Sequence, residues 1–241
     1  MPYRCKRLQV DYPDPPDWTR SDPRIVVQRT EDYGPMTKFA PLLDGVIGAE
    51  AAIILFDDDT IYPDGWWSML LSHYDGSAAV GCHGSLHKQK PFVYSQWNTS
   101  THPCLMGNLS TAWGVVYPRS ALPQSTSEAV EFVGKYDGLI NNDDMALASW
   151  CYQRNIPLKM IPVPHMMIDQ WQTTNPHIDD PNSVSITLDM TKRNQIELAK
   201  KMIVDGVYPP PWPEITVAVI LVVVLILFLF FAVLLLLLAL Q

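Results

Sequence analysis

The sequence predicts an α/β domain, in which helices flank a mostly parallel sheet, followed by a single C-terminal transmembrane helix. Short β-branched runs alternate with amphipathic segments through most of the chain, which is typical of strands that alternate with helices. The apolar run 51–56 ends in three aspartates, as a fully buried strand does when it delivers polar residues at a sheet edge. Residues 215–240 carry no charge, Gly or Pro, and a helix of that length spans a hydrocarbon core of about 30 Å.

The composition favours one folded domain and argues against nucleic acid as a partner. Apolar residues make up 48% of the 241 residues, so the chain can bury a core. The net charge is −8, with 17 Lys and Arg and no basic run, whereas nucleic-acid binding requires a basic surface. None of the four cysteines forms a C-x-x-C pair, so a zinc site is not expected. Four free thiols are favoured over a disulfide between Cys82 and Cys104.

The expected elements follow in chain order. Residues 1–23 are rich in proline and are expected to be irregular. Short β-branched or apolar runs predict strands, and apolar residues that recur on one face predict helices. The strands are expected at 24–28, 51–56, 78–81, 115–117 and 159–163. The helices are expected at 37–47, 63–74, 142–155 and 191–204.

A stiff spacer, residues 206–214, is expected between this domain and the transmembrane helix 215–240. It contains Tyr208-Pro-Pro-Pro-Trp-Pro213, and such a proline run is extended. The lysines and arginine between 192 and 201 lie on the N-terminal side of the helix, which favours a cytosolic domain. The sequons at Asn98 and Asn108 favour a lumenal one. A lipid bilayer is therefore an expected partner, and both orientations stay open.

The aspartate triplet 57–59 directly follows the apolar run. Carboxylates this close raise each other's pKa, and a hard divalent cation with oxygen ligands removes that cost. Asp57 and Asp59 are expected to face one site, because alternate residues of an extended chain point the same way. The pattern predicts a Mn²⁺ or Mg²⁺ site that binds a diphosphate. The alternative is an acidic loop or a cap for the next helix.

Four segments in series resemble a known family. They are Arg29-Thr-Glu-Asp-Tyr-Gly-Pro-Met-Thr-Lys38, Phe56-Asp-Asp-Asp-Thr-Ile-Tyr-Pro63, Gly114-Val-Val-Tyr-Pro-Arg119 and Asn142-Asp-Asp-Met-Ala-Leu147. In order and spacing they are similar to motifs of GT-A glycosyltransferases related to family 2, especially those with a D-Y-G-P-x-T-K segment ahead of the D-x-D strand, which include algal-virus and bacterial polysaccharide enzymes. The resemblance implies a GT-A-like domain over residues 24–205.

The function that the resemblance implies is metal-dependent transfer of a hexosyl or deoxyhexosyl group from a nucleotide-diphosphate sugar to a hydroxyl of a glycan or glycoconjugate. Asp57 and Asp59 would be the D-x-D pair, with Asp59 the direct ligand of Mn²⁺ or Mg²⁺ and His165 a third ligand. The residues that would contact the donor are Lys38, Arg29, Asp32, Asp57 and Asp58.

The acceptor side of the site would involve the segment that opens the helix 142–155. In an inverting enzyme Asp143 or Asp144 would be the general base that takes the acceptor's proton. The alternative is that both acids only favour the helix N-terminus. Trp113 would stack against a sugar, or alternatively belong to the core.

The resemblance departs from the family at its start, because no β-α unit that would grip the nucleotide base precedes residue 24. A truncated domain is therefore expected, and a membrane-tethered inactive relative is the main alternative. A haloacid-dehalogenase-type phosphatase also has an apolar strand ending in D-x-D, but Ile61 stands where that motif needs Thr or Val and no later G-D-x-x-x-D appears. A nucleotidyltransferase would need a Gly-rich basic loop near the N-terminus, which is absent.

Overall fold

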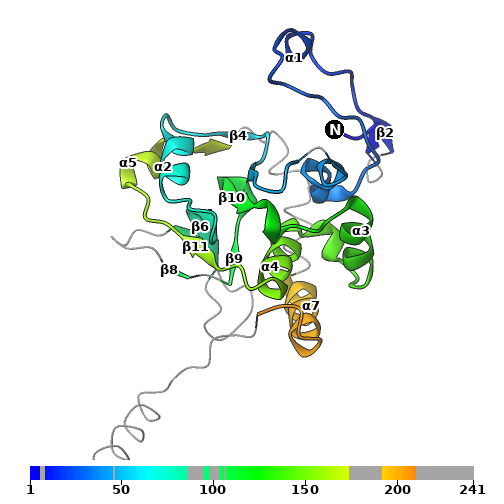
Figure 1. Cartoon of the computed structure of the whole chain (residues 1–241), viewed down its shortest axis with the longest axis vertical. Coiled ribbons are helices and arrows are strands. Elements are labelled where there is room, and N and C mark those ends of the chain that lie inside the picture. The colour runs from blue at the N-terminus through cyan, green and yellow to red at the C-terminus, as the bar shows by residue number, and fades with distance from the viewer. Residues whose placement is uncertain are drawn as a thin grey trace, which may run out of the picture.

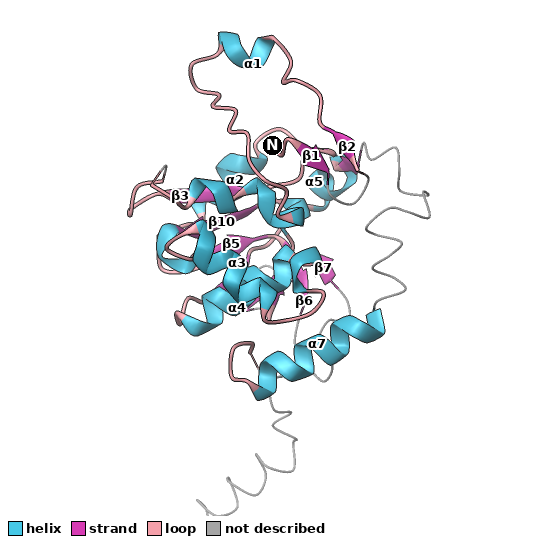
Figure 2. Cartoon of the chain, turned by 90° about the vertical axis from the view of Figure 1, so that its right-hand side faces the viewer, coloured by secondary structure: helices cyan, strands magenta, loops and turns pink. Residues whose placement is uncertain are grey.

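The computed structural model describes residues 1–5, 9–45, 47–85, 95–97, 104–105, 107–173 and 192–209. These residues form a mixed α/β fold in which helices lie on both sides of a central sheet (Figures 1 and 2). The predicted transmembrane helix 215–240 and most of the predicted spacer lie outside them. Within the described ranges no helix has both the length and the apolar character needed to cross a membrane.

The central sheet has the strand order β3-β10-β5-β11-β8. Its strands are β3 (Ala52–Leu55), β10 (Val115–Pro118), β5 (Ala79–Gly81), β11 (Leu158–Met160) and β8 (Cys104–Leu105). Only β5 and β11 pair in parallel, while β10 runs antiparallel to both β3 and β5, and β8 runs antiparallel to β11. The prediction of a mostly parallel sheet is therefore wrong for the described strands.

The direction of β10 explains this difference. Val115, the first residue of β10, faces both Leu55 and Gly81, the last residues of β3 and β5. The chain thus re-enters the sheet at the end where it left β5, so it must run back between β5 and β3. As a consequence β3 and β5 run in the same direction although β10 separates them.

Short strands outside the central sheet form three smaller sheets. The strands are β1 (Arg4–Cys5) with β2 (Val10–Asp11), β4 (Thr60–Ile61) with β12 (Gln172–Thr173), and β6 (His83–Ser85) with β7 (Ser95–Trp97) and β9 (Asn108–Leu109). Asn108 of the second sequon is buried in β9. Cys82 carries a free thiol, so the alternative disulfide with Cys104 does not form.

Two apolar layers lie on opposite faces of the central sheet. The larger one packs α3 (Thr126–Gly134), α4 (Asp143–Gln153) and α7 (Lys192–Val204) against Ile53, Leu55, Val115 and Tyr117. The smaller one packs α2 (Trp66–Ser72) against Val80 and Val116. Neighbouring residues of β5 and β10 therefore point to opposite layers, as the period of two of a strand requires. Figure 1 shows α2 and α5 (His165–Gln170) on one side and α3, α4 and α7 on the other.

Most predicted helices and strands of the domain are present. The predicted elements at 51–56, 63–74, 78–81, 115–117, 142–155, 159–163 and 191–204 correspond to β3, α2, β5, β10, α4, β11 and α7. The strand β3 is only half buried, because it lies at the edge of the sheet, where Ala52 is exposed while Ile53 and Leu55 are buried. The prediction that this strand is fully buried is wrong.

The N-terminal third differs more from the prediction. Residues 1–23 contain the β1–β2 hairpin and a one-turn helix α1 (Trp18–Ser21), which projects from the body of the molecule in Figures 1 and 2. No strand forms at 24–28, where Val26 is 81% exposed and none of the described strands pairs with the segment. The expected helix 37–47 is replaced by two 3₁₀ helices, η1 (Gly34–Lys38) and η2 (Ala40–Leu42). Pro41 explains this, because it lies within the expected helix and proline lacks the N–H that an α-helix interior needs.

Candidate functional site

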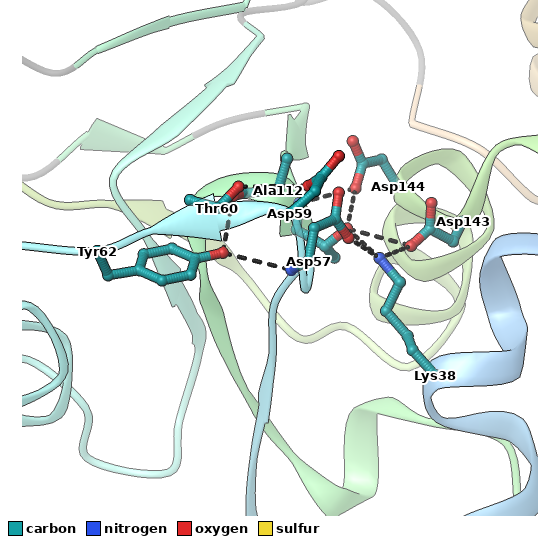
Figure 3. A network of polar contacts seen from close by, with 9 residues as sticks. Lys38, Asp57, Asp59, Thr60, Tyr62, Ala112, Asp143 and Asp144 are labelled. Carbon is teal, nitrogen blue, oxygen red and sulfur yellow. Dashed lines mark hydrogen bonds and ion pairs between the residues drawn. The ribbon is translucent and has the colours of Figure 1, made fainter. Parts of the chain in front are cut away.

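Figure 3 shows a polar network at the C-terminal end of β3, where three segments far apart in sequence meet. Lys38 is the last residue of η1, Asp57 follows β3, and Asp143 and Asp144 open α4. The sequence predicted all four as site residues, and the structure brings them together.

Lys38 is held by three oxygen atoms from three different elements. Its Nζ lies 2.5 Å from Asp57 Oδ1, 2.9 Å from Asp143 Oδ2 and 3.1 Å from Thr111 Oγ1. An ammonium group has three N–H donors, so these contacts can use all of them. Burial opposes the charge, but Asp143 and Asp57 outweigh it and raise the pKa of Lys38 above its ordinary value. The ammonium therefore stays charged at neutral pH.

Thr111 connects this ion-pair network to Asp144. Its backbone N–H donates to Asp144 Oδ1 at 2.8 Å, and its Oγ1 lies 3.0 Å from the same oxygen and 3.1 Å from Asp143 Oδ2. Burial and the neighbouring Asp143 carboxylate raise the pKa of Asp144 to about 7. Asp144 can therefore gain or lose a proton near neutral pH, as a general base must.

The segment Asp32 to Lys38 is built to present the Lys38 side chain. Asp32 Oδ1 accepts a hydrogen bond from the N–H of Gly34 at 2.8 Å, and Thr37 Oγ1 accepts one from Tyr33 at 2.8 Å. Gly34 has φ +62°, and a Cβ there would lie 2.8 Å from Ile140 O. Only glycine fits such a position without strain. The D-Y-G-P-x-T-K pattern is thus explained here by a compact turn.

Tyr62 ties the aspartate loop to the loop ahead of β10. Its hydroxyl donates to Ala112 O at 2.8 Å and accepts from the backbone N–H of Asp57 at 3.3 Å. Burial raises the pKa of Tyr62 to about 12, so the phenol keeps its proton. Asp59 is half buried in the same loop, with Oδ1 3.5 Å from Thr60 Oγ1, and Asp58 is exposed.

Aromatic side chains pack beside this loop. The Phe56 ring lies 5.2 Å from Trp67 and 6.0 Å from Tyr62, centroid to centroid, and Phe56 is 49% exposed. Gly114 has φ +81°, and a Cβ there would lie 2.8 Å from the Trp67 ring. The motif glycine before β10 is therefore required by the close approach of this ring.

Trp113 packs against other aromatic rings. It stacks on Trp171 at 3.6 Å and lies 4.6 Å from the ring of His83. This arrangement agrees with the alternative that Trp113 is a packing residue rather than with the prediction that it stacks on a sugar.

Two predicted site residues make contacts outside the network, and a third is exposed. Arg29 donates to the backbone carbonyls of Pro2 and Pro13 at 3.1 and 2.7 Å, so it holds the N-terminal segment. Asp32 caps the turn at Gly34. His165 is an exposed residue at the start of α5. The described part of the chain contains no group of three or more His, Cys, Asp or Glu side chains arranged to hold a metal ion.

Sequence reasoning missed Thr111 and Tyr62. Thr111 is a single hydroxyl residue within a short connection, and no local pattern of residues distinguishes it. Tyr62 lies within the motif segment Phe56–Pro63, but the motif alone does not indicate that its hydroxyl joins two loops. The motif segment Gly114–Arg119 gave the nearest signal, because Thr111 lies in η3 (Thr111–Trp113), directly ahead of that segment.

Comparison with known proteins does not identify a relative. No protein-family model matches the chain, and no curated protein is similar to it. Any functional assignment therefore rests on the geometry of the network.

Proposed function

We propose that the chain transfers a sugar from a nucleotide-diphosphate donor to an acceptor hydroxyl, as GT-A glycosyltransferases do. The observation that carries this proposal is the convergence of Lys38, Asp57, Asp143 and Asp144 from three separate segments. Acids and a lysine in one place meet the needs of the reaction, because the donor is an anion and the acceptor must lose a proton.

The oxygens of Asp57 and Asp59 suit Mn²⁺ or Mg²⁺ by their chemistry, since both ions prefer carboxylate and phosphate ligands. One oxygen of Asp57 is engaged by Lys38, and Asp59 is the half-buried partner in the same loop. These two residues would hold the cation, and the donor diphosphate would complete its ligands. When bound, the cation would offset the negative charge of the departing diphosphate.

Asp144 is the residue best placed to accept the proton. Thr111 fixes its carboxylate through the backbone N–H and the hydroxyl, and its pKa of about 7 matches the working pH of a general base. In an inverting transfer, the acceptor oxygen bonds to the anomeric carbon as its proton passes to Asp144. The bond from that carbon to the diphosphate breaks, and the nucleoside diphosphate leaves.

The exposed ring of Phe56 offers a surface for the apolar face of a sugar. It stands directly before the aspartate triplet and is supported by Trp67 and Tyr62. Aromatic rings bind flat ligands with apolar faces, while neighbouring polar groups fix their orientation. Phe56 would then have the stacking role that was one of the two alternatives for Trp113.

The test is the release of nucleoside diphosphate from a panel of nucleotide sugars. The full chain is incubated with Mn²⁺, each donor and a mixture of glycan acceptors, and products are measured by mass spectrometry. We expect one donor to be turned over, and the Asp144→Asn variant to lose about a hundredfold or more of the rate. Asp137→Asn, a change in an exposed acid outside the network, is the matched control and should keep the parent rate.

The proposal would be contradicted if the folded chain released no nucleoside diphosphate from any donor. That outcome would favour the membrane-tethered inactive relative. One contact favours this second candidate, because Lys38 already neutralises Asp57 without a metal.

A further inference from the structure

The ammonium of Lys38 lies where a cation is expected. It is in contact with one oxygen each from Asp57, Asp143 and Thr111, and Figure 3 shows it between the loop that follows β3 and the start of α4. The Lys38 and Asp143 side chains are only 21% and 12% exposed. Water can therefore screen these charges only in part.

The carboxylates depend on this ammonium for their neutralisation. Asp57 and Asp143 repel each other, and Asp59 adds to the repulsion at Asp57. Among the described residues the ion pairs of Asp57 and Asp143 are both with Lys38. Paired acids that lose their cation become buried, uncompensated charges, so a site without Lys38 would need another cation.

We propose that Lys38 is a built-in counter-ion of the acidic site and competes with a divalent cation for Asp57. The inference relies on the proposed function for the cation's role in sugar transfer, but not for its binding. It assigns Lys38 a task that the sequence did not indicate, because the predicted role was contact with the donor.

The exchange would also make Lys38 available to the donor. All three N–H donors of the ammonium can be used within the network. A divalent cation that takes over Asp57 frees the N–H donor that Asp57 holds, and a lysine ammonium is a common phosphate-binding group. Cation entry and diphosphate binding would therefore be coupled through this one side chain.

The experiment measures Mn²⁺ binding to the full chain without nucleotide, by the loss of the free-ion signal in electron paramagnetic resonance. Lys38→Met removes the charge and keeps the length of the side chain. We expect this variant to bind Mn²⁺ about tenfold or more tightly than the parent, because the cation no longer displaces an ammonium. Lys38→Arg, which keeps the charge, should bind like the parent. Lys135→Met is the matched control, because Lys135 pairs with Glu131 on the surface, and it should leave Mn²⁺ affinity unchanged.

Melting temperature provides the second measurement. Without Mn²⁺ the Lys38→Met variant should melt below the parent, and saturating Mn²⁺ should raise its melting temperature more than that of the parent. Lys38→Met could be unable to fold without metal. In that case, a variant that folds only with Mn²⁺, beside a parent that folds without it, also supports the proposal.

Folded Lys38→Met that binds Mn²⁺ no tighter than the parent would overturn the counter-ion role. If Lys38→Met stays unfolded at saturating Mn²⁺, the neutral Lys38→Gln decides in its place, and affinity equal to the parent's overturns the proposal. These titrations contain no nucleotide, so their result tests the counter-ion role of Lys38 independently of the proposed sugar transfer. A chain that binds no donor, but whose Lys38→Met variant gains Mn²⁺ affinity, would lose the proposed function and keep the counter-ion.

Discussion

At the scale of single residues, burial and the Asp143 carboxylate raise the pKa of Asp144 from its ordinary value of 3.8 to about 7. The same carboxyl ionises near its ordinary value in the unfolded chain. Between these two values the unfolded chain loses a proton that the folded chain keeps. The contribution of Asp144 to folding stability therefore falls as pH rises from about 4 to about 7, and stays level above that range.

Asp144→Asn should remove this part of the pH dependence, because an amide does not ionise. Urea unfolding at pH 4 and pH 8 measures it. We expect the parent to lose up to about 4 kcal/mol more than the variant between these conditions. Equal losses in the two proteins would show that Asp144 ionises as readily in the folded chain as in the unfolded one.

Gly34 tests the turn that presents Lys38. Alanine at φ +62° is strained, and its Cβ would lie 2.8 Å from a backbone oxygen that cannot move away easily. We expect Gly34→Ala to lower the free energy of unfolding by about 2 kcal/mol. Gly134→Ala is the control, because a Cβ there meets nothing within 4 Å and the residue ends α3. The control should leave stability unchanged or raise it slightly.

Phe56 tests the proposed sugar surface. Its ring is half exposed, so Phe56→Ala should affect stability little. Loss of stacking should raise the KM for the acceptor or the donor by about tenfold while the melting temperature stays within a few degrees. Unchanged KM values for both substrates would remove Phe56 from the site.

At the scale of elements, the N-terminus of α4 is what holds Asp143 and Asp144 in place. Asn142 caps this helix by accepting a hydrogen bond from the Met145 N–H at 2.9 Å. Replacing such a cap with alanine costs about 1 kcal/mol. Asn142→Ala should show that loss in urea unfolding, whereas the cap Ser125→Ala should destabilise α3 by a similar amount without affecting donor turnover.

The sequence predicted the existence of the sheet elements better than their arrangement. The apolar run before Asp57 and the β-branched residues of β10 both predict strands, but a strand has the same pattern in either direction. The antiparallel course of β10 depends on where the chain returns from β9, which is a property of the whole path. The helix predicted at 37–47 does not form for a local reason, since Pro41 lies within it and short 3₁₀ helices take its place.

At the scale of the whole molecule, the candidate site exists because the sheet brings distant segments to one end. The loop after β3, the connection before β10 and the start of α4 meet there, and η1 adds Lys38 from the N-terminal third. The acids and Lys38 could be predicted from the sequence, because several charged motif residues stand out. Thr111 could not, because one hydroxyl in a short connection resembles any other.

For Arg29 and Asp32, the sequence predicted contact with the donor, whereas their observed contacts lie within the fold. Both belong to the segment that carries Lys38, but each is used within the fold: Arg29 holds backbone carbonyls of the N-terminal segment, and Asp32 caps a turn. A motif shows that residues act together, but not which of them face a ligand. The predicted membrane segment 215–240 lies outside the described residues and stays a prediction.

Calorimetric titration of the full chain with a panel of nucleoside diphosphates, with Mn²⁺ and again with a chelator, tests the central claim most directly. We predict that at least one nucleoside diphosphate binds with Mn²⁺, that the chelator abolishes binding, and that Asp59→Asn weakens it at least about tenfold. Asp137→Asn should bind like the parent. Binding that is absent for every nucleotide, or that is equal with and without Mn²⁺ and unaffected by Asp59→Asn, would contradict the account.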